Sequence, residues 1–220
     1  LHAASTLGGG TFGTVYACTK TDAVTGVTQK EAVKVVRVDF TPEDRANAEE
    51  EGIPFADYYR AVKEKRLQEI RWMVALKSPH IVHINGYTAI EEPDHSALYI
   101  LIRMDRLTAL DQLRPAHLND TPEQAAALAE KVALDIYDAL RVCHQNGVLH
   151  RDIKPANILC SDAGDFYLGD FGISKGTAQQ ASMTSSGTLE YAPREVMTGQ
   201  YDHRADLYSL GLVLYALVNH

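Results

Sequence analysis

The sequence predicts an α+β chain with two lobes, the first rich in strands and the second rich in helices. Short runs of β-branched and aromatic residues recur through residues 1–102, and such runs are typical of strands. Through much of residues 107–220, apolar residues instead recur at helical spacing. Residues 103–106 are mostly charged and interrupt an apolar run, so we expect a hinge between the lobes there.

The composition argues against several classes of protein. Of the 220 residues, 45% are hydrophobic and 23% are charged, which is typical of a globular core rather than of a disordered chain. A formal net charge of −8 disfavours nonspecific binding to nucleic acid or to an anionic membrane. No apolar run approaches the ~20 residues of a membrane span. The 3 cysteines form no Cys-x-x-Cys pair, which indicates a reducing, intracellular and cytoplasmic setting.

A glycine-rich loop follows Leu7 and has the pattern G-x-G-x-x-G-x-V at Gly8, Gly10, Gly13 and Val15. A dinucleotide-binding glycine loop opens a helix, whereas the residues after this loop are β-branched and aromatic and indicate a strand. A glycine loop between two strands can lay backbone N–H groups over phosphates, because no Cβ blocks their approach. We therefore expect a phosphate-binding hairpin.

Two charged residues stand out in the rest of the first lobe. Lys34 lies among apolar residues of a predicted strand at 31–38, and it either faces solvent or reaches a phosphate. An acidic linker with a short helix is expected at 39–55, followed by a helix at 57–76. Glu69 lies near the apolar face of that helix, where an unpaired carboxylate is costly, so it is either solvated or a partner of Lys34.

Two more strands, expected at 81–85 and 98–102, complete the first lobe. The second lobe contains a long amphipathic helix at 122–146, with Thr121 as its N-cap and Gly147 at its end. The final helix is expected at residues 206–218 and is apolar nearly all round, which is typical of a buried helix. Since few residues follow that helix to cover it, we expect the chain to be a piece of a longer protein.

The densest group of polar residues is the loop at 150–157, His-Arg-Asp-Ile-Lys-Pro-Ala-Asn, which lies between short apolar segments. A hairpin signal over 158–168 should return the chain so that Asp170 lies near Asp152 and Asn157. Asp170 and Asn157 offer oxygen ligands, which suit a hard cation such as Mg²⁺. This loop is the predicted site of the chemistry.

The ordered set of motifs resembles a eukaryotic-type protein kinase domain of the serine/threonine branch. The residues that carry the resemblance are the glycine loop, Ala32 to Lys34, Glu69, His150 to Asp152, Asn157, Asp170 to Gly172, Gly187, Thr188, Glu195 and Asp206 to Gly211. The resemblance implies a bilobal protein kinase-like fold. An antiparallel five-stranded sheet with one main helix would form the N-lobe (1–102). A hinge (103–106) would follow, and then a mostly helical partial C-lobe (107–220), incomplete at its C-terminus.

The resemblance also implies an activity, the transfer of the γ-phosphoryl group of ATP to serine or threonine hydroxyls of protein substrates with Mg²⁺. Asp152 would orient the hydroxyl, Lys154 would steady the γ-phosphoryl group, and Asn157 with Asp170 would hold the metal. Lys34, held by Glu69, would pair with the α- and β-phosphates. The ATP-binding residues implied by the family are Leu7, Gly8, Gly10, Gly13, Val15, Ala32, Lys34, Ile102, Met104 and Leu159.

A Ser/Thr-rich segment over 176–187 is the expected activation segment. By the resemblance, Arg151 beside Asp152 implies activation by an upstream kinase, because a phosphate on the segment would pair with this arginine. The candidate phosphosites are Thr184 first, then Ser182, Ser185 and Ser186, with Thr188 and Glu195 completing the segment.

Three residues depart from the family pattern. Arg194 interrupts the usual Ala-Pro-Glu, Tyr208 stands where tryptophan is common, and Arg103 replaces an acidic residue in the expected hinge. None of the three removes a catalytic group. The alternatives are a pseudokinase or scaffold that binds nucleotide or partners without phosphotransfer, and a kinase of small molecules. The complete catalytic set and the Ser/Thr-rich segment favour a protein kinase over both.

Overall fold

The computed structural model describes residues 2–10, 13–117, 120–170, 190, 191, 193 and 202–219. The chain divides into two compact units. Unit 1 consists of residues 1–75 and 83–106, and unit 2 consists of residues 76–82 and 107–220. Among the described residues, none of the helices combines the length and the hydrophobicity of a membrane span.

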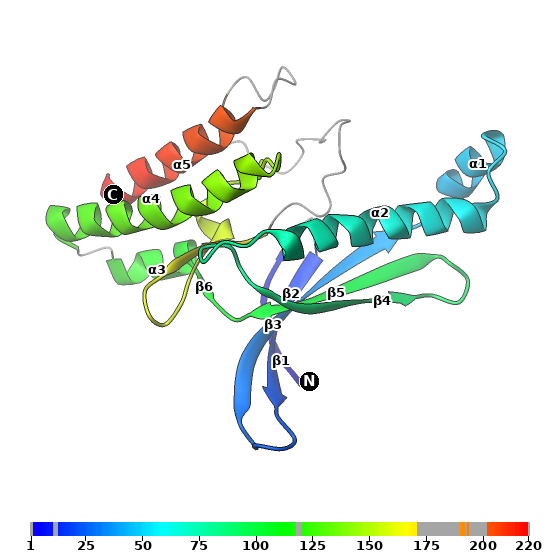
Figure 1. Cartoon of the computed structure of the whole chain (residues 1–220), viewed down its shortest axis with the longest axis horizontal. Coiled ribbons are helices and arrows are strands. Elements are labelled where there is room, and N and C mark those ends of the chain that lie inside the picture. The colour runs from blue at the N-terminus through cyan, green and yellow to red at the C-terminus, as the bar shows by residue number, and fades with distance from the viewer. Residues whose placement is uncertain are drawn as a thin grey trace. The chain divides into compact units, whose positions relative to one another are not determined.

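Unit 1 is built on a five-stranded sheet (Figure 1). Its strands are β1 (His2–Gly10), β2 (Gly13–Thr21), β3 (Thr28–Asp39), β4 (Ile84–Glu91) and β5 (Ala97–Asp105). They lie in the order β1-β2-β3-β5-β4, and all neighbours pair antiparallel. The antiparallel five-stranded sheet is confirmed. Since β5 continues to Asp105, most of the expected hinge belongs to the sheet, and the boundary between the units lies after Arg106.

The strand expected at residues 81–85 is present, but its predicted start is wrong. β4 begins only at Ile84, and residues 76–82 belong to unit 2. Ile81 instead forms a parallel bridge with Leu168, and the N–H of Val82 donates to the Leu168 carbonyl at 3.0 Å. The apolar pair Ile81-Val82 correctly indicated burial, with both residues at most 8% exposed. Hydrophobicity alone did not reveal which unit buries them.

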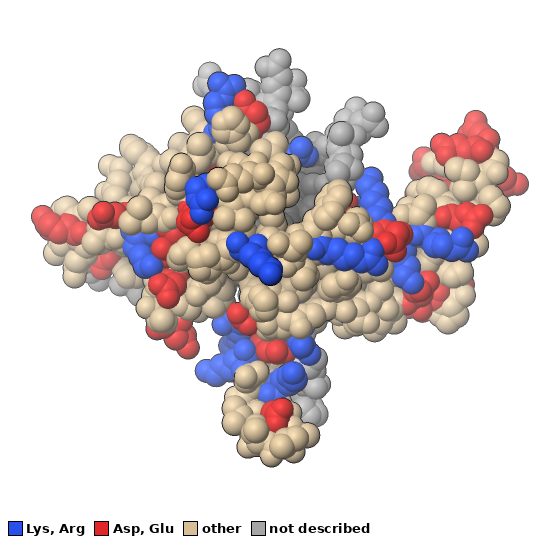
Figure 2. All heavy atoms as spheres, in the orientation of Figure 1, with Lys and Arg blue, Asp and Glu red and all other residues tan. Residues whose placement is uncertain are grey.

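Two helices complete unit 1, α1 (Pro42–Glu50) and α2 (Phe55–Ala75). Thr41 and Asp44 form a reciprocal capping box that starts α1. Figure 2 shows acidic side chains gathered on α1, whereas both signs of charge alternate along α2. Phe40, at the end of β3, packs on Tyr59 of α2 with ring centroids 4.6 Å apart. Through such contacts and the fully buried Ile70, α2 is fixed within unit 1.

Unit 2 is mostly helical. Its elements are β6 (Thr108–Ala109), α3 (Leu110–His117), α4 (Pro122–Gln145), η1 (Pro155–Asn157), β7 (Ile158–Cys160), β8 (Phe166–Leu168) and α5 (His203–Val218). β6, β7 and β8 form a small antiparallel sheet. The helix cap at Thr121 and the β7–β8 hairpin are confirmed. No sequence pattern predicted β6 or α3.

Helix α5 packs against α4, with Val213 and Leu217 of α5 and Val132 and Ile136 of α4 all buried. The helix is not buried on every side, because Tyr208 and Tyr215 on it are more than half exposed. The apolar composition of α5 therefore corresponds to a helix that is buried on one face, not on all sides.

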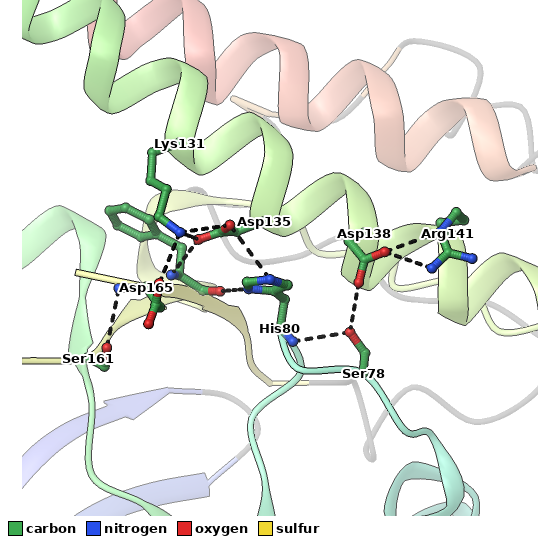
Figure 3. A network of polar contacts seen from close by, with 9 residues as sticks. Ser78, His80, Lys131, Asp135, Asp138, Arg141, Ser161 and Asp165 are labelled. Atoms are coloured by element: carbon green, nitrogen blue, oxygen red, sulfur yellow. Dashed lines mark hydrogen bonds and ion pairs between the residues drawn. The ribbon is translucent and has the colours of Figure 1, made fainter. Parts of the chain in front are cut away.

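A polar network holds residues 76–82 on unit 2 (Figure 3). His80 donates from Nδ1 to the carbonyl of Phe166 at 3.0 Å, and Ser78 Oγ lies 3.4 Å from Asp138 of α4. The buried Asp135 accepts from the N–H of Phe166 at 2.9 Å and pairs with Lys131 at 2.8 Å. This segment therefore joins α4 to the β7–β8 hairpin, which precedes Asp170.

Candidate active site

One face of the unit 1 sheet carries Lys34 together with several residues predicted to bind ATP. Lys34 lies opposite Val15 of β2 and Ile102 of β5, and Ala32 lies opposite Met104. Directly opposed residues, and residues two apart on one strand, point to the same face of a sheet. Lys34 is only 5% exposed, which argues against the alternative of a solvent-facing lysine.

Arg103 belongs to the opposite face, because it lies opposite Val33, the neighbour of Lys34. Its Nε lies 3.2 Å from the buried carboxylate of Glu31, and its Nη2 donates to the Asn85 carbonyl at 3.0 Å. This departure from the family pattern therefore has a local structural role, and its side chain lies away from the face of Lys34.

The glycine loop is a hairpin between β1 and β2, in which Gly10 pairs with Gly13. Gly13 has φ +121°, and a Cβ there would lie 2.3 Å from the carbonyl oxygen of Val35. Only glycine fits this close approach. A Cβ on Gly8 would meet nothing within 4 Å, so that side of the hairpin is open. Leu7 lies at a register shift between β1 and β2.

Glu69 lies on α2 with 14% of its side chain exposed. Its Oε2 lies 3.3 Å from Nη1 of Arg66, and its Oε1 is buried without a hydrogen-bond partner. Burial raises the pKa of Glu69, and the guanidinium of Arg66 offsets this only in part. Glu69 is therefore not a solvated surface charge. Its pairing with Lys34 stays a prediction.

In unit 2, a buried carboxylate fixes the start of the loop at 150–157. Asp206, on α5, accepts hydrogen bonds from the backbone N–H groups of His150 at 2.9 Å and Arg151 at 2.8 Å. His144 Nε2 lies 2.9 Å from the same carboxylate. Burial acts to raise the pKa of Asp206, but these hydrogen bonds outweigh it, so the pKa lies below its ordinary value.

His150 links this loop to the residue before Asp170. The backbone N–H of Asp152 donates to His150 Nδ1 at 3.3 Å, so Nε2 carries the proton and donates to the Gly169 carbonyl at 2.8 Å. Burial lowers the pKa of His150, despite the opposing effect of the nearby Asp206 carboxylate, and favours this neutral form.

The structure brings Asp152, Lys154 and Asn157 together. Asp152 is 6% exposed, and its Oδ2 lies 3.1 Å from Lys154 Nζ and accepts a hydrogen bond from Asn157 Nδ2, also at 3.1 Å. Asn157 Nδ2 donates as well to the backbone carbonyl of Asp152 at 2.7 Å, across the single turn of η1. The carboxylate is thus held in place by an ammonium and an amide.

The two predicted metal ligands, Asn157 and Asp170, carry side-chain oxygen atoms of the kind that Mg²⁺ binds. Because Asn157 uses its amide nitrogen to hold Asp152, its Oδ1 is the amide atom that can bind a cation. The N–H of Gly169 donates to the Asn157 carbonyl at 2.9 Å, which ties the backbone just before Asp170 to this residue. Mg²⁺ commonly takes one or two protein oxygens and completes its shell with phosphate oxygens and waters. Within the described ranges, no group of three His, Cys, Asp or Glu side chains forms a metal site.

Two residues of the site were not predicted, and one predicted group lies outside the described residues. Asp206 and His144 were given no role from the sequence, although a carboxylate heading an apolar helix signals a buried charge that needs partners. The predicted activation-segment residues all fall outside the described residues: Ser182, Thr184, Ser185, Ser186, Thr188 and Glu195.

Comparison with known proteins identifies the family. The sequence matches the protein kinase domain family over residues 1–220, and the chain belongs to this family. It is 35% identical over 158 residues to Aurora kinase B of Drosophila melanogaster, an alignment that covers 71% of this chain and 46% of that protein. It is 34% identical over 222 residues to serine/threonine-protein kinase PknJ of Mycobacterium tuberculosis, covering 96% of this chain and 32% of PknJ. The chain therefore spans less than half the length of these relatives.

Proposed function

We propose that the protein transfers the γ-phosphoryl group of ATP to serine or threonine hydroxyls of protein substrates. The observation that carries the proposal is the buried Asp152 carboxylate, held 3.1 Å from both Lys154 Nζ and Asn157 Nδ2. Phosphoryl transfer depends mainly on positioning and charge stabilisation, and a fixed carboxylate beside a lysine suits that chemistry. Relatives named as serine/threonine-protein kinases support the choice of hydroxyl.

In the proposed reaction, Asp152 orients the substrate hydroxyl and accepts its proton. The hydroxyl oxygen bonds to the γ-phosphorus as the bond between that phosphorus and the β,γ-bridging oxygen breaks, which leaves ADP. Lys154 stabilises charge on the transferring group. Asn157 and Asp170 would hold Mg²⁺, which supplies charge neutralisation on the phosphate oxygens. Positioned acid–base groups of this kind contribute ~10²- to 10⁴-fold to rates.

Unit 1 would contribute phosphate and adenine contacts. The β1–β2 hairpin would cover the phosphates with backbone N–H groups, and the apolar face around Lys34 would accept the adenine. Lys34 would contact the α- and β-phosphates and be held by Glu69, whose Oε1 is the carboxylate atom without a hydrogen-bond partner. A desolvated ion pair of this kind fixes the lysine more firmly than a solvated one.

Regulation and location belong to the same proposal. An upstream kinase would phosphorylate Thr184, or Ser182, Ser185 or Ser186, and the phosphate would pair with the exposed Arg151. All three cysteines are free thiols, which supports a reducing, cytoplasmic setting.

The test compares wild-type full-length protein with Asp152→Asn. We expect the wild type to label serine and threonine in protein substrates with MgATP. Asp152→Asn should lose nearly all turnover and still bind MgATP. Asp162→Asn, in the exposed turn between β7 and β8, is the matched control and should retain activity. A wild type that binds MgATP and labels no protein overturns the proposal in favour of a scaffold, and labelling confined to tyrosine overturns the assigned hydroxyl.

A further inference from the structure

Gly169, the residue directly before Asp170, is held by hydrogen bonds on both sides of its backbone. Its N–H donates to the Asn157 carbonyl at 2.9 Å, and its carbonyl accepts from His150 Nε2 at 2.8 Å. Both partners belong to the loop at 150–157. Residue 169 therefore cannot shift without breaking a buried hydrogen bond.

The space around Gly169 excludes even a methyl group. A Cβ at this position would lie 2.9 Å from Leu159 Cδ1 and 3.3 Å from Val82 Cγ2, closer than the ~3.5–4.0 Å of a normal carbon contact. Gly169 is not among the glycines with positive φ. Packing, rather than backbone conformation, thus requires glycine here.

Of the two crowding side chains, Leu159 is the one that can yield. Val82 is 8% exposed, and its N–H is bonded to the Leu168 carbonyl, so its position is set by the backbone. The nearest atom of Leu159 is the end methyl of a flexible side chain, and Leu159 is only half-buried. A side chain at residue 169 would therefore displace Leu159.

We propose that Gly169 is a positioning residue that sets nucleotide affinity through the side chain of Leu159. The inference depends on the proposed function and on the family resemblance, which implies that Leu159 is one of the ATP-binding residues; we take it to contact the adenine. With glycine at 169, the side chain of Leu159 occupies the space that a Cβ of residue 169 would take. A larger residue at 169 would force Leu159 to another position. The pocket for the base would then fit adenine less well.

The test is a double-mutant cycle on the full-length protein, read as the Kd for MgADP and MgATP by calorimetry. Gly169→Ala should weaken binding by roughly threefold to tenfold, as expected for mild overpacking. Leu159→Val removes the crowding methyl and should weaken binding by itself, and in that background Gly169→Ala should have little further effect. Gly211→Ala adds a methyl that meets nothing within 4 Å and is the matched control.

A second readout separates positioning from general damage. In Gly169→Ala, the kcat at saturating ATP should remain within about twofold of wild type while KM for ATP rises. An unchanged Kd in Gly169→Ala, or an equal loss of affinity in both backgrounds, overturns the inference. If Gly169→Ala does not fold, recovery of folding by added Leu159→Val supports the steric coupling, and failure to recover overturns it. A wild type that binds MgATP but phosphorylates nothing overturns the proposed function alone, since the cycle measures binding.

Discussion

The carboxylate of Asp206 accepts a 2.8 Å hydrogen bond from the backbone N–H of Arg151, a residue whose φ is +64°. A left-handed conformation at a non-glycine residue costs about 1–2 kcal/mol and persists only where its surroundings hold it. Asp206 also accepts from the N–H of His150, so one buried side chain fixes two successive peptide groups. The conformation of the loop that carries Asp152 thus depends on a residue of α5.

Asp206→Asn should destabilise the protein and reduce its activity. Asparagine keeps one acceptor oxygen and turns an amide N–H₂ toward a backbone donor, which leaves a buried donor unpaired. We expect a loss of about 3 kcal/mol in the free energy of unfolding, measured by chemical denaturation. Asp202→Asn, at the half-exposed N-cap of the same helix, is the control and should cost about 1 kcal/mol or less. Equal losses in the two variants would contradict the role of Asp206 in fixing the peptide groups of His150 and Arg151.

Gly13→Ala should destabilise unit 1 far more than Gly8→Ala. The first substitution places a Cβ 2.3 Å from the Val35 carbonyl oxygen at φ +121°, and the second places it in open space. We expect Gly13→Ala to cost about 2 kcal/mol or more, and Gly8→Ala to remain within about 0.5 kcal/mol of wild type. Thermal unfolding measures both. Similar unfolding temperatures for the two variants would show that the hairpin tolerates a side chain at residue 13.

The buried His150 should make stability fall in mild acid. Because burial lowers its pKa from the ordinary 6.5, the unfolded chain binds the proton more tightly than the folded chain. The contribution of His150 is therefore fully present above about pH 6.5 and is lost as the pH falls below it, with a slope of up to about 1.4 kcal/mol per pH unit. Denaturation between about pH 7.5 and 5.5 measures the slope. His150→Phe should reduce it, whereas substitution of the exposed His83 by Gln should not.

Glu69→Gln should stabilise the fold at neutral pH while it reduces activity. Burial raises the pKa of Glu69, so its charged form opposes folding above the ordinary pKa of 4.5. Glutamine removes that charge, so the unfolding temperature of the Glu69→Gln variant should exceed that of wild type at neutral pH. The difference between the two should vanish below about pH 4.5. Activity should fall by about tenfold or more, because Lys34 loses its proposed partner. Glu64→Gln, on the exposed face of the same helix, is the control. A lowered unfolding temperature in Glu69→Gln would contradict this prediction, because it would show that the attraction between Glu69 and Arg66 exceeds the free-energy cost of burying the carboxylate.

Local patterns were sufficient for most elements of the fold. Periodicity and capping residues predicted α4 with its cap at Thr121, and glycine placement predicted the β1–β2 hairpin. These features depend on residues close in the sequence, whose preferences act over a single turn or strand. The segment at 76–82 was assigned to the first lobe because its apolar residues resemble a strand, and only long-range contacts with α4 and Leu168 place it in unit 2.

The same division applies to the candidate site. Local motifs were enough to identify the chemical groups of the site and their order along the chain: the glycine loop, Lys34, Glu69, Asp152, Lys154, Asn157 and Asp170. The partners that surround those groups depend on how the chain folds. Arg103 points away from the face of Lys34, and Asp206 holds a loop more than fifty residues earlier in the chain. Burial and hydrogen bonding set those pairings, and both depend on residues far apart in the sequence that only folding brings together.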